Sequence, residues 1–289
     1  MQWLPYRWYY QIIFILYRWV VAGFFFAWLV ASGFSSDNGG PRYFIFLTNW
    51  SFLAFNAHLV WAAVVSTVDF FREFVCCRRQ YEDLGETRSL AYQRDLETPT
   101  GCCGKGHNKI SWYHMIQWVL FLIGVELAVV VTILYWPLFY PHGSRITGVD
   151  FNTHGTQGII AVIELLFSGV PIRFYHFYYT QIFSAVYAIF SGIYFAADGT
   201  NVQGDPFIYD VLDYGGSPGL ATGLVLVVIL VMLPAVHAVF YLVYVARYWM
   251  LFLIYRKCTS TTSSAHAQLE EVEKGADSPE AGSELKEVS

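Results

Sequence analysis

This amino-acid sequence predicts an all-α fold, a polytopic integral membrane bundle of about six transmembrane helices with both termini in the cytosol. The first observation behind this prediction is composition, because 56% of the 289 residues are hydrophobic and only 13% are charged. Soluble domains usually carry about 25% charged residues, so lipid is the expected solvent for most of this chain. The other two observations are the lengths of the apolar runs and the distribution of basic residues between them.

The apolar runs give the number of expected spans. A bilayer core about 30 Å thick is crossed by a helix of roughly 20 apolar residues. Runs of this kind cover residues 11–33, 44–70, 111–136, 151–170, 175–197 and 220–255. The first run lacks a following small-residue cleavage site, so we expect it to be a retained helix. A transmembrane domain over 1–256 and a disordered, Ser- and Glu-rich tail over 257–289 follow from this pattern.

The basic residues set the expected orientation. Seven Lys or Arg residues fall in the Cys-rich connection 71–110, which positions that loop in the cytosol. The connection 198–219 has no Lys or Arg and carries four Asp residues, so we expect it outside. With an even number of helices, both termini are then cytosolic. We expect this bundle in the plasma membrane rather than in the endoplasmic reticulum.

The cysteines all fall on the expected cytosolic side, where disulfides are rare. Cys76 and Cys77 directly follow the second predicted helix and Cys258 follows the sixth, a setting typical of S-palmitoylation. Inert thiols are the alternative. A zinc site that also uses Cys102–Cys103 and His107 is disfavoured, because adjacent cysteines lack the usual two-residue spacing. We therefore predict no metal and no cofactor.

Polar side chains interrupt two of the predicted spans at matching depths. Thr48 and His58 lie on the second helix, and His154 and Glu164 lie on the fourth. Ionisable groups at membrane depth are costly and usually face the protein interior. At a rise of 1.5 Å per residue, Thr48 and His154 can share one layer, with His58 and Glu164 forming an interior polar pair below it. Glu126 on the third helix is expected near the upper layer.

The Thr48–His154 layer has two interpretations. A hydroxyl beside an imidazole is the minimal pair of nucleophile and base, and a carboxylate such as Glu126 would orient the histidine. Alternatively, all of these side chains form interhelical hydrogen bonds that hold the bundle together. The residue spacing alone leaves both interpretations open.

Three stretches of the chain resemble the rolling stone family of membrane proteins. They are Tyr43-Phe-Ile-Phe-Leu-Thr-Asn-Trp-Ser51, Pro171-Ile-Arg-Phe-Tyr-His176, and Ile193–Tyr209 followed by Val211-Leu-Asp213. The last stretch contains the motif Gly204-Asp-Pro-Phe-Ile-Tyr209. The resemblance implies a multi-pass membrane protein linked to cell–cell fusion during muscle formation, at least in insects.

A more remote resemblance is to the androgen-induced transmembrane hydrolases, which cleave fatty acid esters of hydroxy fatty acids with an intramembrane Thr and His. This resemblance assigns those roles to Thr48 and His154. The sequence departs from that family around the histidine, where it reads Phe151-Asn-Thr-His-Gly155.

Two functions follow as hypotheses. The first is a role in cell–cell adhesion or fusion, such as myoblast fusion, and the second is intramembrane hydrolysis of a lipid ester. The expected partners are membrane lipids, a lipid-ester substrate and other membrane proteins. A transporter is disfavoured because no broken helix pair or internal repeat is apparent. The chain has no basic stripe of the kind that binds nucleic acid.

Overall fold

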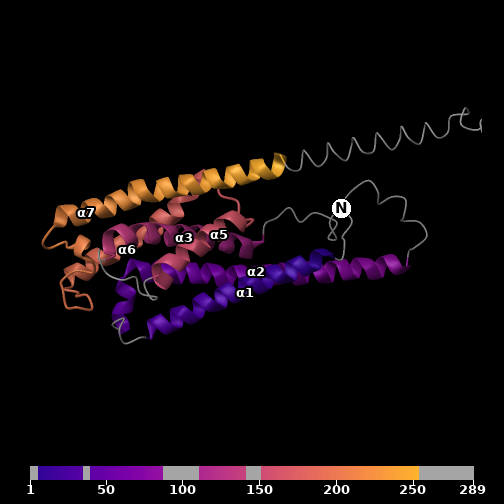
Figure 1. The fold of residues 1–289 in the computed structure, drawn as a ribbon, viewed down its shortest axis with the longest axis horizontal. Helices are drawn as coiled ribbons and strands as arrows, with labels where there is room; N and C mark the ends of the chain where they lie inside the picture. The colour runs from indigo at the N-terminus through magenta and orange to yellow at the C-terminus, as the bar shows by residue number, and fades with distance from the viewer. Residues whose placement is uncertain (1–5, 35–39, 87–110, 141–150, 254–289) are drawn as a thin grey trace, which may run out of the picture. The chain divides into compact units, whose positions relative to one another are not determined.

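The computed structural model of this chain describes residues 6–34, 40–86, 111–140 and 151–253. The regular secondary structure in these ranges is all helical (Figure 1). The α-helices are α1 (Tyr6–Gly33), α2 (Leu47–Glu86), α3 (Trp112–Leu134), α5 (Gln157–Phe167), α6 (Tyr178–Ala196) and α7 (Pro218–Val227). Short 3-10 segments are η2 (Gly40–Ile45), η5 (Phe174–Phe177) and η6 (Asp210–Leu212). The π-helical segments are η3 (Tyr135–Phe139), η4 (Phe151–Thr156) and η7 (Val228–Met232). The prediction of an all-α fold is confirmed.

Four of the helices are long and apolar enough to cross a membrane. These spans are Tyr9–Gly33, Leu47–Arg72, Trp112–Leu138 and Pro218–Leu253. The other two predicted spans also form helices, but each falls short of that standard. Residues 151–167 rise only about 25 Å, and α6 carries Thr180, Gln181 and Ser184 among its apolar residues.

The chain divides into two compact units, residues 1–240 and 241–289. In the second unit, the described residues 241–253 are helical. The predicted tail 257–289 lies outside the described residues. The cavities and polar clusters described in the following paragraphs all belong to the first unit.

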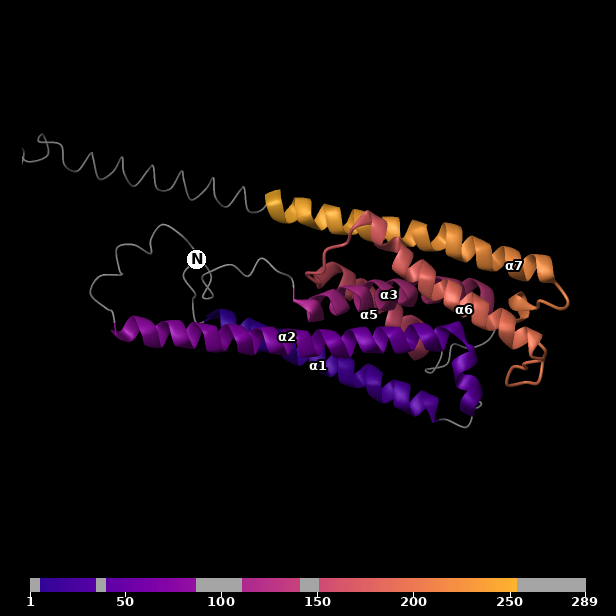
Figure 2. The same cartoon turned by 180° about the vertical axis from the view of Figure 1, so that it is seen from behind.

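Helix α3 lies at the centre of the first unit, packed against α2, α5 and α6 (Figures 1 and 2). Gly124 allows its close approach to α2. A Cβ atom at Gly124 would lie 2.9 Å from the Ala54 carbonyl oxygen and 2.9 Å from the Phe55 Cα atom. Small residues of this kind let helix backbones approach closely in membranes, where dispersion contacts rather than the hydrophobic effect drive packing.

Helix α1 carries many exposed apolar side chains. It packs beside α2, and both views show the two helices side by side (Figures 1 and 2). Large apolar side chains such as Val20 and Phe26 are more than half exposed. Since exposed apolar residues along a membrane span face acyl chains, this surface is the expected lipid face. One exception on this helix is Arg18, which is only 7% exposed.

Candidate functional site

The three π-helical segments of the described residues all border one region of the first unit. Segment η3 supplies Tyr135 and Leu138, η4 supplies His154, and η7 supplies Ile229 to the walls of two cavities there. The π-helix is rare, and it occurs mostly at functional sites, where the extra residue per turn redirects side chains. The local backbone therefore favours this region as the site.

Segments η3 and η4 place Tyr135 and His154 face to face. Their ring centroids are 3.5 Å apart and the ring planes differ by 9°. The Thr132 hydroxyl lies 2.7 Å from the His154 carbonyl oxygen and so links α3 to the histidine backbone. Trp28 of α1 donates a long hydrogen bond, at 3.4 Å, to the neighbouring Thr153 hydroxyl. These contacts fix the position and the plane of the His154 ring.

Thr48 lies in the first turn of α2, beside the connection between α6 and α7. Its side chain and backbone both form hydrogen bonds with the Tyr209 phenol. Burial raises the pKa of Tyr209, and the hydrogen bond from Thr48 only partly offsets this effect. Tyr209 therefore stays protonated at neutral pH, and its hydroxyl can donate a hydrogen bond to a ligand.

Thr48 and His154 line the same wide cavity, whose volume is about 630 Å³. Its walls come from η2, the start of α2, η3, η4 and the acidic connection between α6 and α7. Many of the lining side chains are polar: Ser32, Tyr43, Thr48, Asn49, Tyr135, Thr153, His154, Asn201, Gln203, Asp205, Tyr209 and Asp210. A cavity of this size with convergent polar groups is suited to a small-molecule or lipid headgroup.

A second, narrower cavity of about 80 Å³ adjoins the first. Most of its lining is apolar and comes from α2, α3, α6, α7 and η7: Leu47, Val131, Leu134, Ala188, Leu224, Val225, Val228 and Ile229. Four residues line both cavities: Thr48, Tyr135, Tyr209 and Val211. The Thr48 side chain therefore lies where a polar space meets an apolar one.

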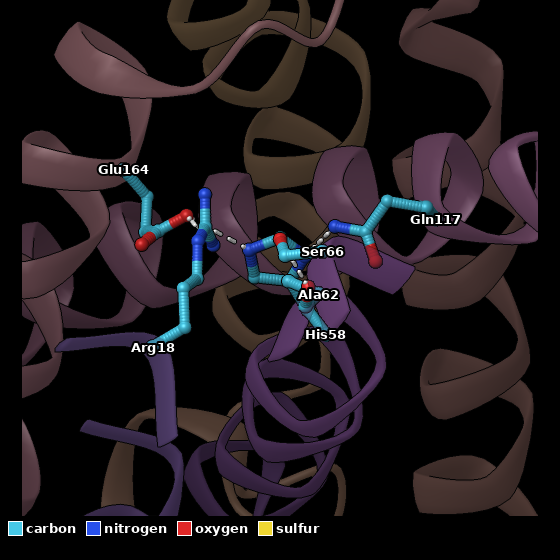
Figure 3. Close-up of polar contacts among 6 residues, drawn as sticks. All are labelled: Arg18, His58, Ala62, Ser66, Gln117 and Glu164. Carbon is cyan, nitrogen blue, oxygen red and sulfur yellow. Dashed lines mark hydrogen bonds and ion pairs between the residues drawn. The ribbon is translucent and has the colours of Figure 1, made fainter. Parts of the chain in front are cut away.

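The predicted interior pair, His58 and Glu164, lies in contact one layer away from this site. His58 Nε2 is 3.4 Å from Glu164 Oε2, and both side chains are buried. The same oxygen accepts a 2.6 Å hydrogen bond from Arg18 Nη1, and Gln117 Nε2 lies 3.0 Å from His58 Nδ1. Figure 3 shows these four residues, here called the lower cluster, joined across α1, α2, α3 and α5.

The hydrogen bonds of the lower cluster indicate its charge state. If the Gln117 amide nitrogen donates to Nδ1, then His58 Nε2 carries the hydrogen and donates to Glu164. His58 is then neutral, and the Arg18 and Glu164 charges cancel. A cluster with no net charge is the arrangement that a bilayer interior favours. The Arg18–Glu164 ion pair and the His58 ring are bonded within the cluster, and neither cavity includes any of the four residues.

Glu126 lies outside the upper layer in which the sequence pattern had placed it. Tyr135 of η3 stacks on the His154 ring, and about 13 Å of helical rise separates Tyr135 from Glu126. The Glu126 carboxylate instead accepts a 2.8 Å hydrogen bond from Thr180 and lies 3.3 Å from His237 Nδ1. The expectation that Glu126 orients His154 was therefore wrong in geometry, because the carboxylate faces α6 and the helix that contains His237.

The acylation candidates are not placed by this structure. Cys76 and Cys77 belong to α2, but their side chains lie outside the described residues, as does all of Cys258. Palmitoylation at these positions stays a prediction.

Sequence reasoning missed three residues that prove central to these contacts. Arg18 could have been identified from the sequence, because an arginine in the middle of an apolar span needs a polar or charged partner. Tyr135 and Tyr209 gave no such signal, since tyrosines are abundant in this chain and are common at membrane interfaces.

Comparison with known proteins matches this chain to a described family. The sequence profile of the family described as Protein rolling stone matches residues 2–268. The chain belongs to the rolling stone family. A Drosophila melanogaster relative, Protein rolling stone, is 27% identical over 209 residues, which cover 70% of this chain and 66% of that protein. No solved structure gives a significant match. Membership confirms the resemblance drawn from the sequence motifs and supports a multi-pass membrane protein.

Proposed function

We propose that this rolling stone family protein hydrolyses a lipid ester in the wide cavity, with Thr48 as nucleophile and His154 as base. The observation that carries the proposal is that the two residues line one cavity that adjoins an apolar pocket. The other matched pair, His58 and Glu164, lies one layer below and is in mutual contact outside both cavities. Thr48 and His154 both lie on a cavity wall, where a substrate can reach them.

In the proposed reaction, the Thr48 hydroxyl oxygen attacks the ester carbonyl carbon while His154 takes its proton. The tetrahedral intermediate collapses when the ester C–O bond breaks, and His154 returns the proton to the departing alcohol. Water then attacks the acyl-Thr48 ester with the same proton transfers and releases the fatty acid. Tyr209, which stays protonated and contacts Thr48, supplies a hydrogen-bond donor for the developing oxyanion.

A fluorophosphonate probe tests the proposed nucleophile directly. The purified wild-type protein should be labelled at Thr48, as located by mass spectrometry of the labelled peptide. Thr48→Ala and His154→Ala should each remove the label. Thr67→Val is a matched control, because it removes a hydroxyl from the same helix, α2, at a position that lines neither cavity. Labelling that persists in Thr48→Ala would contradict the assignment.

The family resemblance favours a second function, a role in cell–cell adhesion or fusion at the plasma membrane. The two functions are compatible, since an enzyme that changes lipids in the outer leaflet can alter the tendency of two membranes to fuse. A cell-mixing assay with wild-type protein and Thr48→Ala separates them. Loss of content mixing in Thr48→Ala at equal surface expression ties fusion to catalysis, and full activity of that variant makes fusion independent of it.

A further inference from the structure

The paired cavities constrain what the ligand of this site can be. The narrow cavity is apolar and the wide cavity is polar, and Thr48 lies at their junction. An ester bound with its carbonyl at Thr48 would therefore place an acyl chain in the narrow cavity and its alcohol portion in the wide one.

The charges around the wide cavity constrain the alcohol portion further. Asp205 and Asp210 line it, and no Lys or Arg does so among the described residues. Asp205 is held by the Asn201 amide, which donates to its Oδ2 at 3.0 Å. The nearby Arg42 donates to the Thr200 hydroxyl at 3.2 Å and lines neither cavity. An anionic group would thus meet two carboxylates without a compensating cation from the described walls.

The aromatic residues of the wide cavity point to the same ligand chemistry. Tyr43, Phe46 and Tyr209 line it together with the two carboxylates, beside Tyr135, whose ring stacks on His154. Aromatic faces attract ammonium groups through their quadrupole, and quaternary ammonium ligands are typically held in aromatic cages. Resting on the proposed hydrolase reaction, we propose that the ligand is a single-chain fatty acyl ester whose alcohol portion carries an ammonium group. Its chain occupies the narrow cavity, and its ammonium group lies by Asp205 and Asp210.

The test measures binding in the non-hydrolysing Thr48→Ala protein, full length and in neutral detergent. Three lauroyl esters are compared: lauroylcholine, lauroylglycerol and lauroylglycerol phosphate, which are cationic, neutral and anionic. Lauroylcholine should bind about tenfold more tightly than lauroylglycerol, and the phosphate should bind most weakly. Asp210→Asn should remove most of this preference. Asp198→Asn, which makes the same charge change at an exposed position outside the cavity, should leave it intact.

A second pair of variants tests where the acyl chain of the ligand binds. Ala188→Phe fills the narrow cavity and should abolish lauroylcholine binding while butyrylcholine still binds. Ala185→Phe, on the same helix but outside the cavity lining, should bind both esters normally.

Equal binding of all three lauroyl esters, no binding of any of them, or a preference unchanged in Asp210→Asn would overturn this ligand assignment. The proposed reaction is tested by a separate outcome. If the wild-type protein hydrolyses none of the esters but the charge preference holds, the ligand assignment stands and the hydrolase does not. If it hydrolyses the anionic ester as fast as lauroylcholine, the hydrolase stands and the ligand assignment falls.

Discussion

Two layers of the bundle are built from the same two stretches of chain and have opposite properties. Thr48 and His58 lie ten residues apart on α2, and His154 and Glu164 lie ten residues apart on η4 and α5. In the lower layer, His58 and Glu164 touch and recruit Arg18 and Gln117 into a closed, buried cluster. In the upper layer, Thr48 and His154 face a cavity of about 630 Å³.

The difference between the two layers separates structural from functional polar residues in a membrane protein. Both layers satisfy the rule that intramembrane polar groups face the protein interior. In the lower layer, Arg18 and Gln117 bond to the His58–Glu164 pair, so the role of the pair is to hold helices together. The upper layer also has a wide cavity, an apolar cavity beside it and π-helical segments that redirect side chains toward them. A substrate requires such a space.

The largest effect on stability is expected in the lower layer. Glu164→Leu leaves Arg18 buried without its carboxylate, and breaking a buried ion pair in this way costs about 3–5 kcal/mol. The free energy of unfolding can be measured by titration with a denaturing detergent. The double variant Arg18→Leu/Glu164→Leu should recover much of the loss, because no buried charge is left unpaired. Equal losses in the single and double variants would show that the ion pair is not the cause.

A second, smaller effect is expected at the α2–α3 contact that supports both layers. Gly124→Ala places a Cβ atom 2.9 Å from the backbone of α2 and should destabilise the protein by about 1–3 kcal/mol. Gly192→Ala is the matched control, because no atom lies within 4 Å of the added Cβ in α6. That change should be neutral or stabilising by up to about 1 kcal/mol through helix propensity. Unfolding of both variants under one condition gives the comparison, and a stable Gly124→Ala would contradict it.

The smallest effect is expected at Glu126. Thr180 and His237 both contact the same atom, Glu126 Oε2, and Glu126→Gln keeps an oxygen there for the Thr180 hydroxyl, so stability should fall by no more than about 1.5 kcal/mol. Hydrolysis should be nearly unchanged, since Glu126 lies about 13 Å of helical rise from Tyr135. A large loss of turnover with unchanged stability would place Glu126 in the catalytic machinery after all.

The sequence predicted the helices and the two-layer arrangement better than it predicted which side chains contact one another. Helical spacing and depth are local properties, so the polar stripe of α2 and the matching depths of His58 and Glu164 follow from the residue order. The choice of Arg18 as partner for Glu164 depends on how α1 rotates and packs, which no local pattern encodes. Glu126 was misplaced because the helix continues outward through η3, so that Tyr135, nine residues further along, stacks on His154 instead. The π-helical segments were equally inaccessible, since one inserted residue is set by tertiary contacts.

We infer that the upper layer is functional and the lower layer structural. The most direct measurement is the rate of fatty acyl ester hydrolysis by Thr48→Ala, His154→Ala and His58→Ala, each normalised to the folded fraction of the same preparation. We expect losses of about 100-fold or more for Thr48→Ala and His154→Ala, with no further loss when they are combined. His58→Ala should be less stable but retain its rate per folded molecule. Full activity of Thr48→Ala, or a comparable loss of rate in folded His58→Ala, would contradict the claim.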